Sequence, residues 1–441
     1  MISISNAISM SGLSASLSGG GANNDFVIEV DTTKAGSASD TIILPLQSGG
    51  TYSGTIDWGD SSTSALSYAN RQHTYASGGT YTITISGTDL IGWGGVHTDR
   101  LKMIDISNWG FFTLTNASAF QQHSNLDISA TDAPSIGTTN LSYCFFACTS
   151  LTTPDFSQWD VSGVTNMRQM FYGCSLFNGD VSNWDVSSVT LMSDGNYGMF
   201  ANCNVFNNDI GGWDVSSNTI FGGMFRNARA FNQNIGNWDV SGSNNFGNMF
   251  FGASAFDNGG SNDIDNWDVS GTASFSGMFR EAIAFNRYIG SWDMSSATYL
   301  YQMFTLCRSF NQDISGWDVS NVQNMRDMFY DCNVFNQPIG AWNTSSVTNM
   351  FQMFYNCYAF DQDLSNWDIN QVSNFSNFAY FVTLSTANYD ALLIAWDAQG
   401  AMSFSGVAHF GSSKYTSGGA AEAARTSLIS KWGGISDGGA A

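Results

Sequence analysis

The chain has 441 residues, 43% of them hydrophobic and only 11% charged, and 14 lysines and arginines stand against 36 aspartates and glutamates, a formal net charge of −22. This length and hydrophobic content allow several domains with a substantial core, whereas the negative surface argues against nucleic acid and anionic membranes as partners. No stretch approaches the roughly 18 apolar residues of a membrane span, so we expect no membrane insertion.

Residues 1–24 are predicted to be an anchor or linker. Residues 18–24 are glycine, serine, alanine and asparagine, which is typical of a flexible linker. Apolar residues recur before it at Ile2, Ile4, Ile8, Met10 and Leu13. No basic residue precedes a long apolar run, so we expect no general secretory signal. Two interpretations stay open: a disordered terminus, or an anchor that orders only against a partner chain.

Residues 25–98 are predicted to form a small β-sandwich. Short runs rich in β formers, broken by Gly, Ser, Asn and Asp, occur at residues 26–30, 41–44, 52–58 and 80–85. Tyr81, Ile83 and Ile85 alternate with polar residues, as expected of a strand with one buried face.

Three segments of this region resemble the signature of PKD-type immunoglobulin-like domains. They are Thr-Ile-Asp-Trp-Gly-Asp at 55–60, His-Thr-Tyr at 73–75 and Gly-Thr-Tyr-Thr-Ile at 79–83. The resemblance implies that these residues build turns and core, so His73 is expected to be structural and not catalytic.

Nine tryptophans then recur at spacings of 25, 29, 25, 29, 25, 25, 25 and 25 residues. They are Trp159, Trp184, Trp213, Trp238, Trp267, Trp292, Trp317, Trp342 and Trp367. This period predicts a repeat solenoid, in which each unit contacts only its neighbours and the tryptophans form a structural ladder. Trp109 lies two periods earlier, so the solenoid is assigned to residues 99–380. Residues 381–441 lose the period and are predicted to be its C-terminal cap, with a helix at 421–431.

Each 25-residue unit is predicted to be a leucine-rich-repeat-like α/β coil of strand, turn, helix and return. The segment 314–319 is rich in β formers, which indicates an extended conformation. A stripe at i, i+3, i+6/i+7 and i+10 predicts a short amphipathic helix, formed by Val322, Met325, Met328, Phe329 and Cys332.

The two 29-residue spacings contain turn-forming insertions, near residues 193–196 and 258–261. Such insertions are expected to bulge from the solenoid without breaking it, and they are its least repetitive surface. Candidate recognition residues are therefore Asp194, Asn196, Asn258, Ser261 and Asn262. The alternative is neutral variation of loop sequence.

Two polar columns accompany the tryptophans. One follows each repeat Trp: Asp160, Asp185, Asp214, Asp239, Asp268, Asp293, Asp318 and Asp368, with Asn343 in the remaining unit. Asx turns that accept backbone N–H groups are the favoured interpretation, and calcium bridging between carboxylates is the alternative. The other column follows the repeat Phe, and it is expected to form an internal ladder that satisfies the backbone: Asn178, Asn207, Asn232, Asp257, Asn286, Asn311, Asn336 and Asp361.

The cysteines are predicted to be free thiols in the core. Cys174, Cys307, Cys332 and Cys357 occur 15 residues after a repeat Trp, where other units carry Ala228, Ala253 and Ala282. Exchange of Cys with Ala indicates a small buried residue. Helices packed about 8–10 Å apart would also hold successive thiols beyond the roughly 7 Å Cα separation that a disulfide needs.

We expect no catalytic site and no cofactor. The four histidines are His73, His97, His123 and His409, and they belong to no nucleophile or metal-ligand motif. Cys144 and Cys148 form a C-x-x-x-C pair, but no second pair or nearby His completes a zinc site.

Residues 310–329, Phe-Asn-Gln-Asp-Ile-Ser-Gly-Trp-Asp-Val-Ser-Asn-Val-Gln-Asn-Met-Arg-Asp-Met-Phe, closely resemble the repeat of BspA-like leucine-rich-repeat surface proteins. The resemblance extends over residues 99–441 and implies surface display and adhesion, with ligands that are mostly undefined. We expect a host-surface protein or glycan as the partner.

Our leading hypothesis is a bacteriophage structural protein, a virion fibre or capsid decoration that attaches to the host. It is expected to bind other virion proteins through residues 1–24 and to be a homo-oligomer on the particle. The alternatives are a bacterial cell-surface adhesin exported without a recognisable signal and, third, a glycan-acting enzyme.

Overall fold

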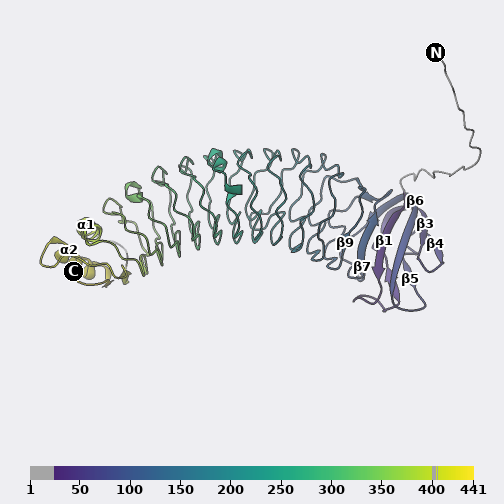
Figure 1. The fold of residues 1–441 in the computed structure, drawn as a ribbon, viewed down its shortest axis with the longest axis horizontal. Coiled ribbons are helices and arrows are strands. Elements are labelled where there is room, and N and C mark those ends of the chain that lie inside the picture. The colour runs from purple at the N-terminus through teal and green to yellow at the C-terminus, as the bar shows by residue number, and fades with distance from the viewer. Residues whose placement is uncertain (1–23, 400–403, 405) are drawn as a thin grey trace, which may run out of the picture.

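The computed structural model describes residues 24–399, 404 and 406–441, so the predicted anchor at 1–24 lies outside the described residues apart from Asn24. A twisted sheet at one end is followed by a curved stack of coils and, at the other end, by two helices (Figure 1). None of the helices in the described part of the chain is long and apolar enough to cross a membrane.

The N-terminal part forms a six-stranded sheet in the order β4-β3-β6-β1-β7-β9 and a separate antiparallel pair of β2 with β5. Its strands are β1 (Phe26–Asp31), β2 (Thr41–Ile43), β3 (Leu46–Asp57), β4 (Thr63–Ala65), β5 (Gln72–Thr74), β6 (Thr80–Trp93), β7 (Met103–Asn108) and β9 (Asp127–Ile128). Alternate residues Phe26, Ile28 and Val30 of β1 are fully buried. The four runs of β formers in the sequence fall in β1, β2, β3 and β6.

This sheet continues into the first coils. β7 pairs antiparallel with β1 on one side and parallel with β9 on the other. The short strands β8 (Thr113–Leu114) and β10 (Ser135–Ile136) form a second parallel pair. The boundary expected at residue 98 therefore separates two parts that share one hydrogen-bonded sheet.

Residues 137–380, called the coil array below, contain no α-helix and no strand of two or more residues. All of these residues are described, and their helical turns are the 3-10 helices η1 (Asn258–Gly260), η2 (Asp263–Asn266) and η3 (Ile339–Ala341). Isolated parallel bridges join each coil to the next through Ile220, Asn245, Ser274, Tyr299, Asn324, Asn349 and Asn374. The strand expected at 314–319 is wrong, because these residues form no strand. The bridges between coils lie instead at Asn324 and at the equivalent residues of the other coils.

The short helix expected in each unit is also wrong. Asp327 and Asp331 have φ of 53° and 60°, left-handed values that interrupt a right-handed helix. Some backbone N–H groups bond the next coil and others bond their own coil. The N–H of Phe329 donates to Met353 O of the next coil at 3.0 Å, whereas the N–H of Cys332 donates to Phe329 O of the same coil at 3.0 Å. Successive tight turns thus replace the helix, and half of their N–H groups link neighbouring coils.

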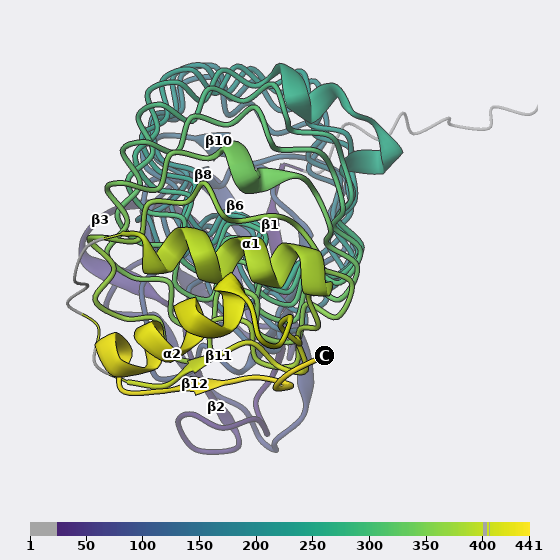
Figure 2. The ribbon, with the colours of Figure 1, turned by 90° about the vertical axis from the view of Figure 1, so that its left-hand side faces the viewer.

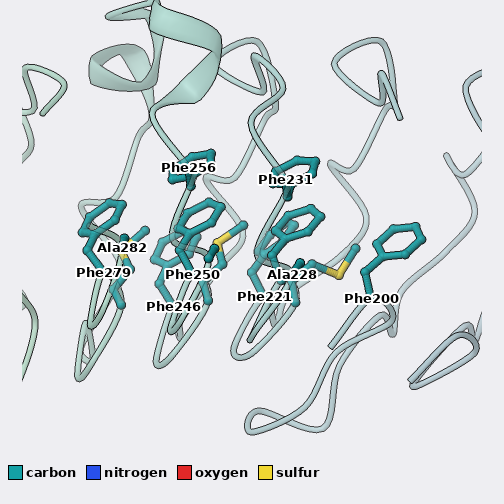
Figure 3. Close-up of a cluster of buried hydrophobic side chains, with 14 of the residues drawn as sticks. Phe200, Phe221, Ala228, Phe231, Phe246, Phe250, Phe256, Phe279 and Ala282 are labelled. Carbon is teal, nitrogen blue, oxygen red and sulfur yellow. The ribbon is translucent and has the colours of Figure 1, made fainter. Parts of the chain in front are cut away.

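Columns of phenylalanine fill the coil array (Figure 3). Phe200, Phe225, Phe250 and Phe279 stack in successive coils at centroid distances of 6.0, 5.7 and 5.6 Å with rings within 7° of parallel. Phe231 of a second column lies 3.9 Å from Phe225 within the same coil. Aromatic pairs of this geometry contribute roughly 0.5–1.5 kcal/mol each beyond their buried area, so every coil is stabilised by its neighbours.

The last coil is covered by α1 (Thr386–Asp397) and α2 (Ala420–Trp432), which lie across its open end (Figure 2). The parallel strands β11 (Ala408–His409) and β12 (Ile435–Ser436) lie beside them. The helix expected at 421–431 coincides with α2, which ends at Gly433 in the left-handed conformation common at helix C-termini. Leu392 and Trp396 of α1 are buried against the end of the coil array.

Candidate recognition surface

The nine repeat tryptophans lie in the core, each at most 4% exposed. The Trp317 ring lies parallel to that of Trp342, with centroids 6.4 Å apart, and its Nε1 donates to Ile289 O at 2.9 Å. Trp396 continues the pattern, since its Nε1 donates to Leu364 O at 3.2 Å. Sequence reasoning missed this tenth member, although it follows Trp367 by 29 residues, the spacing of the two longer units.

The aspartates that follow the tryptophans form Asx turns. Asp160 Oδ1 accepts the Ser162 hydroxyl at 2.6 Å and the Ser162 backbone N–H at 3.1 Å, and these bonds lower the pKa of Asp160. The same backbone bond is made by Asp185, Asp214, Asp239, Asp268, Asp293, Asp318, Asp368 and Asn343. The Asx interpretation of this column therefore agrees with its geometry.

Calcium bridging finds no geometric support in the described residues. No group of three or more His, Cys, Asp or Glu side chains is placed there to hold a metal ion. One carboxylate oxygen of most column members is already engaged by the turn that the residue caps.

The asparagine column links successive coils. Asn286 Oδ1 accepts the backbone N–H of Asn311 at 3.0 Å, and Asn311 Oδ1 accepts that of Asn336 at 2.9 Å. Gln312 Nε2 adds a bond to Asn286 Oδ1 at 3.0 Å. The ladder satisfies the backbone as expected; six of its eight members are half-buried, and Asn207 and Asn311 are exposed.

All seven cysteines are free and fully buried. Cys332 Sγ donates to Phe304 O at 2.8 Å, and burial raises the pKa of this thiol. The distance argument from packed helices is wrong, because the coil array has no such helices. Six of the seven thiols donate to a carbonyl oxygen of the preceding coil.

The first insertion is a tight, well-bonded turn. Asp194 Oδ1 accepts the backbone N–H groups of Asn196 and Tyr197, both at 2.9 Å, and its Oδ2 accepts Gln169 Nε2 of the preceding coil at 2.6 Å. Asp194 therefore holds the turn, and because the residue is also exposed it stays a candidate recognition residue. Asn196 is exposed and stays a candidate.

The second insertion contains one residue that cannot recognise a ligand. Asn258 is fully buried, and its Oδ1 accepts the Ile235 backbone N–H at 2.9 Å while its Nδ2 donates to Ser261 O at 3.1 Å. Ser261 is half-buried, and its hydroxyl oxygen accepts the backbone N–H of Asp263 at 3.1 Å. Asn262 is exposed, although its Oδ1 accepts the Tyr288 N–H at 3.2 Å.

A more extensive exposed surface lies on the two residues that follow the Cys/Ala column of each coil. We call this the display row, and it comprises residues 175–176, 204–205, 229–230, 254–255, 283–284, 308–309, 333–334 and 358–359. Large apolar side chains there are 42–59% exposed: Leu176, Val205, Ile283, Val334 and Tyr358. Sequence reasoning missed this row because it sought irregular loops, whereas the exposed apolar residues recur with the repeat.

A surface groove crosses four coils at the centre of the display row. Arg229, Ser254, Ile283 and Arg308 of the row line it, together with Glu281 and other residues of the adjoining turns. Arg308 is paired with Asp331, Nη2 to Oδ2 at 2.7 Å. The groove thus combines an exposed aliphatic side chain with charges of both signs.

The histidines do not converge on one site. His73 stacks on Trp58 at 4.8 Å and bonds Asp60 Oδ2 at 2.8 Å in the N-terminal domain. His97 and His123 meet near the first coils, their Nε2 atoms 3.1 Å apart, and burial lowers the pKa of His97 to about 4 and of His123 to about 3. This pair joins residues 26 positions apart, a contact that no sequence signal indicated.

The coils thus define a repeat protein with a continuous aromatic core and a regular exposed face. The family described as "Mycoplasma protein of unknown function, DUF285" matches residues 139–262, 259–342 and 313–410, more than half of the chain. The chain belongs to this family, and three matches along the coil array agree with a BspA-like repeat protein. No curated protein and no solved structure matches it.

Proposed function

We propose that this chain is a non-enzymatic attachment protein of a bacteriophage particle, a fibre or capsid-decorating appendage whose coil array presents a recognition surface to the host. The display row carries the proposal. Its exposed Leu176, Val205, Val334 and Tyr358 are large apolar groups that the fold leaves in water. Exposed apolar side chains mark an interaction site when they gather into a contiguous patch, and the repeat aligns these residues along one row.

The composition and shape support a role outside the cell. The coil array forms an elongated, curved body between the N-terminal sheet and the cap (Figure 1). A net charge of −22 limits self-association and non-specific binding to nucleic acid. A role outside the cell is also supported by two resemblances, that of the repeats to BspA-like surface proteins and that of residues 55–83 to PKD-type domains.

A bacterial cell-surface adhesin is the second candidate. The observation that favours it is the family match, whose description refers to Mycoplasma proteins. Mass spectrometry of purified virions distinguishes the two candidates, because it detects the chain at stoichiometric level only if it is a virion protein. Brief proteolysis of intact bacteria releases peptides of the chain only if it is a cell-surface adhesin.

The display row is tested by binding of the full chain to host cells. Leu176→Ser, Val205→Ser and Val334→Ser combined should lower cell binding at least tenfold without changing the melting temperature, since these side chains are exposed. Val96→Ser, at a 54% exposed position outside the coil array, is the matched control. Unchanged binding by the triple variant contradicts the proposal, and release of reducing sugars from surface polysaccharide would favour a glycan-acting enzyme.

A further inference from the structure

A pocket of about 220 Å³ lies where the last coil meets the cap. It is smaller than the roughly 300–1,000 Å³ of pockets that hold drug-sized ligands, so it suits a single small ring. Its lining comes from three distant segments: Tyr380, Phe381, His409, Gly411, Ser412 and Ser436.

Phe381 occupies a position that packing and backbone geometry do not favour for this residue. Its φ is 66°, a left-handed value that is unusual for a bulky side chain. The matching positions of the two preceding coils hold Asp331 and Asn356, residue types that tolerate this conformation better. Phe381 is nevertheless 52% exposed, so burial does not offset the strain. Leu306 adopts the same conformation three coils earlier, so what distinguishes Phe381 is the large aromatic ring that this backbone position holds at the surface.

The neighbouring aromatic rings hold the pocket wall in place. Tyr330, Tyr355 and Tyr380 stack in successive coils at 4.8 and 5.4 Å, with rings within 10° of parallel. The Phe381 ring meets that of Tyr380 edge-on at 4.4 Å. A ligand would therefore find these surfaces already ordered, which reduces the entropy lost on binding.

The pocket lining also contains polar side chains that can form hydrogen bonds with a ligand, namely His409, Ser412 and Ser436. His409 Nδ1 is buried and has no hydrogen-bond partner among the described residues, and the His409 ring lies 5.0 Å from that of Tyr380. Buried polar atoms almost always have a partner, so this ring keeps hydrogen-bonding capacity that a ligand hydroxyl could satisfy. Ser412 and Ser436 add hydroxyl groups that both donate and accept.

Among the described residues, no carboxylate, lysine or arginine lines the pocket. Aromatic faces beside hydroxyl and imidazole groups, without formal charge, match a neutral ring that has an apolar face and a polar rim. We propose that this pocket binds a neutral hexose or N-acetylhexosamine unit of a surface glycan. The Tyr380 and Phe381 rings contact the apolar face of the sugar, and His409 Nδ1 bonds one of its hydroxyls. This inference rests on the proposed attachment function and names its ligand class.

The probes are the methyl glycosides of glucose, galactose and N-acetylglucosamine, observed by saturation-transfer NMR with the full chain. At least one should receive saturation, and Phe381→Asn should weaken its binding at least tenfold. Asn stands at the matching position of the preceding coil, so this variant should fold as well as the wild type. Tyr68→Ala, which removes a 39% exposed aromatic of the N-terminal domain, outside both the pocket and the display row, should bind like the wild type. His409→Phe keeps the ring and removes the nitrogen, and it should weaken binding at least threefold.

Absence of saturation transfer to all three glycosides overturns the sugar site, as does unaltered binding by Phe381→Asn. The attachment function is read separately, by host-cell binding of the display-row variant. Sugar binding that depends on Phe381, without any binding to host cells, would leave the pocket standing and remove the proposed function.

Discussion

Asp99 and Lys102 are both fully buried, with Lys102 Nζ 3.9 Å from Asp99 Oδ1, and both bind the same loop of the N-terminal domain. Asp99 accepts the backbone N–H groups of Ser37 at 2.6 Å and Ile43 at 2.7 Å. Lys102 Nζ donates to Ala38 O at 2.8 Å and Thr41 O at 2.7 Å. The pair thus attaches residues 37–43 to the start of the repeats.

Lys102→Met should lower the free energy of unfolding of this region by about 3–5 kcal/mol, because it leaves the Asp99 carboxylate buried without its partner. Urea denaturation followed by tryptophan fluorescence measures the effect. The double variant Asp99→Asn, Lys102→Met should lose less free energy of unfolding than the two single variants lose in sum. Additive losses would show that the two side chains act independently.

Trp317→Ala should destabilise the coil array by about 3–5 kcal/mol through the cavity that it leaves between coils. The change also removes the Nε1 bond to Ile289 O. Trp317→Phe keeps part of the ring stack, so it should destabilise the coil array less than Trp317→Ala does. Thermal unfolding by circular dichroism provides the comparison, and an alanine variant that melts like the wild type would falsify the one-Trp-per-coil core.

Asn258→Ala should cost about 1–3 kcal/mol, because it leaves the buried Ile235 N–H without its acceptor. Asn196→Ala, in the other insertion, should change stability by no more than about 0.5 kcal/mol, since Asn196 is exposed. Chemical denaturation of the two variants side by side checks this difference. Equal stabilities would mean that the second insertion is not anchored by the Asn258 amide.

Stability should fall as the pH is lowered from about 6.5 to 5 because of His97 and His123. Burial, with a further contribution from Arg100, lowers the pKa of His97 to about 4, and burial beside His97 lowers that of His123 to about 3. In the unfolded chain these histidines take up a proton near pH 6.5, whereas in the folded chain they stay neutral until a much lower pH. Each histidine therefore lowers the free energy of unfolding by up to about 1.4 kcal/mol for each pH unit below about 6.5.

Denaturation midpoints at pH 7, 6 and 5 measure this loss. The double variant His97→Asn, His123→Asn should show a flatter dependence between pH 6.5 and 5. Aspartates with lowered pKa, such as Asp60 at about 2, contribute mainly at still lower pH. A slope that the double variant leaves unchanged would exclude the histidine pair as its source.

Thiol titration should find seven free cysteines after denaturation without reductant and almost none before it. The reason is that all seven are fully buried and burial raises the pKa of thiols such as Cys144 and Cys174. Fewer than seven thiols in the denatured protein would reveal disulfides, and rapid reaction of the native protein would show that the coils open.

The period of the tryptophans and the alternation in residues 80–85 sufficed to predict stacked coils and the main strands of the N-terminal domain. The conformation inside a coil could not be predicted in the same way. Tight turns three residues apart place Met325, Met328 and Cys332 on one side, just as a helix does. The distinguishing signal was the frequent occurrence of Gly, Asn, Asp or Gln at two positions four residues apart where φ is positive, as at Asn248 and Gly252 or Asp327 and Asp331.

The candidate sites were predicted less well, for a different reason. Spacing located the insertions, but it could not show that the Asn258 side chain turns inward to bond the preceding coil. The pocket at the cap brings Phe381, His409 and Ser436 together from three segments, and only the packing of the cap on the last coil determines that arrangement.

The hydrogen bonds that run from each coil to the next have a mechanical consequence. They lie along the long axis, so a pull between the N-terminal sheet and the cap stretches them directly. At any junction several such bonds share the force, among them Asp327 to Phe351, Phe329 to Met353 and Asp331 to Tyr355. Successive junctions carry the same load one after another, so extension would proceed by the opening of single junctions. If the chain has the proposed attachment role, such stepwise opening lengthens it under shear before the whole coil array unfolds.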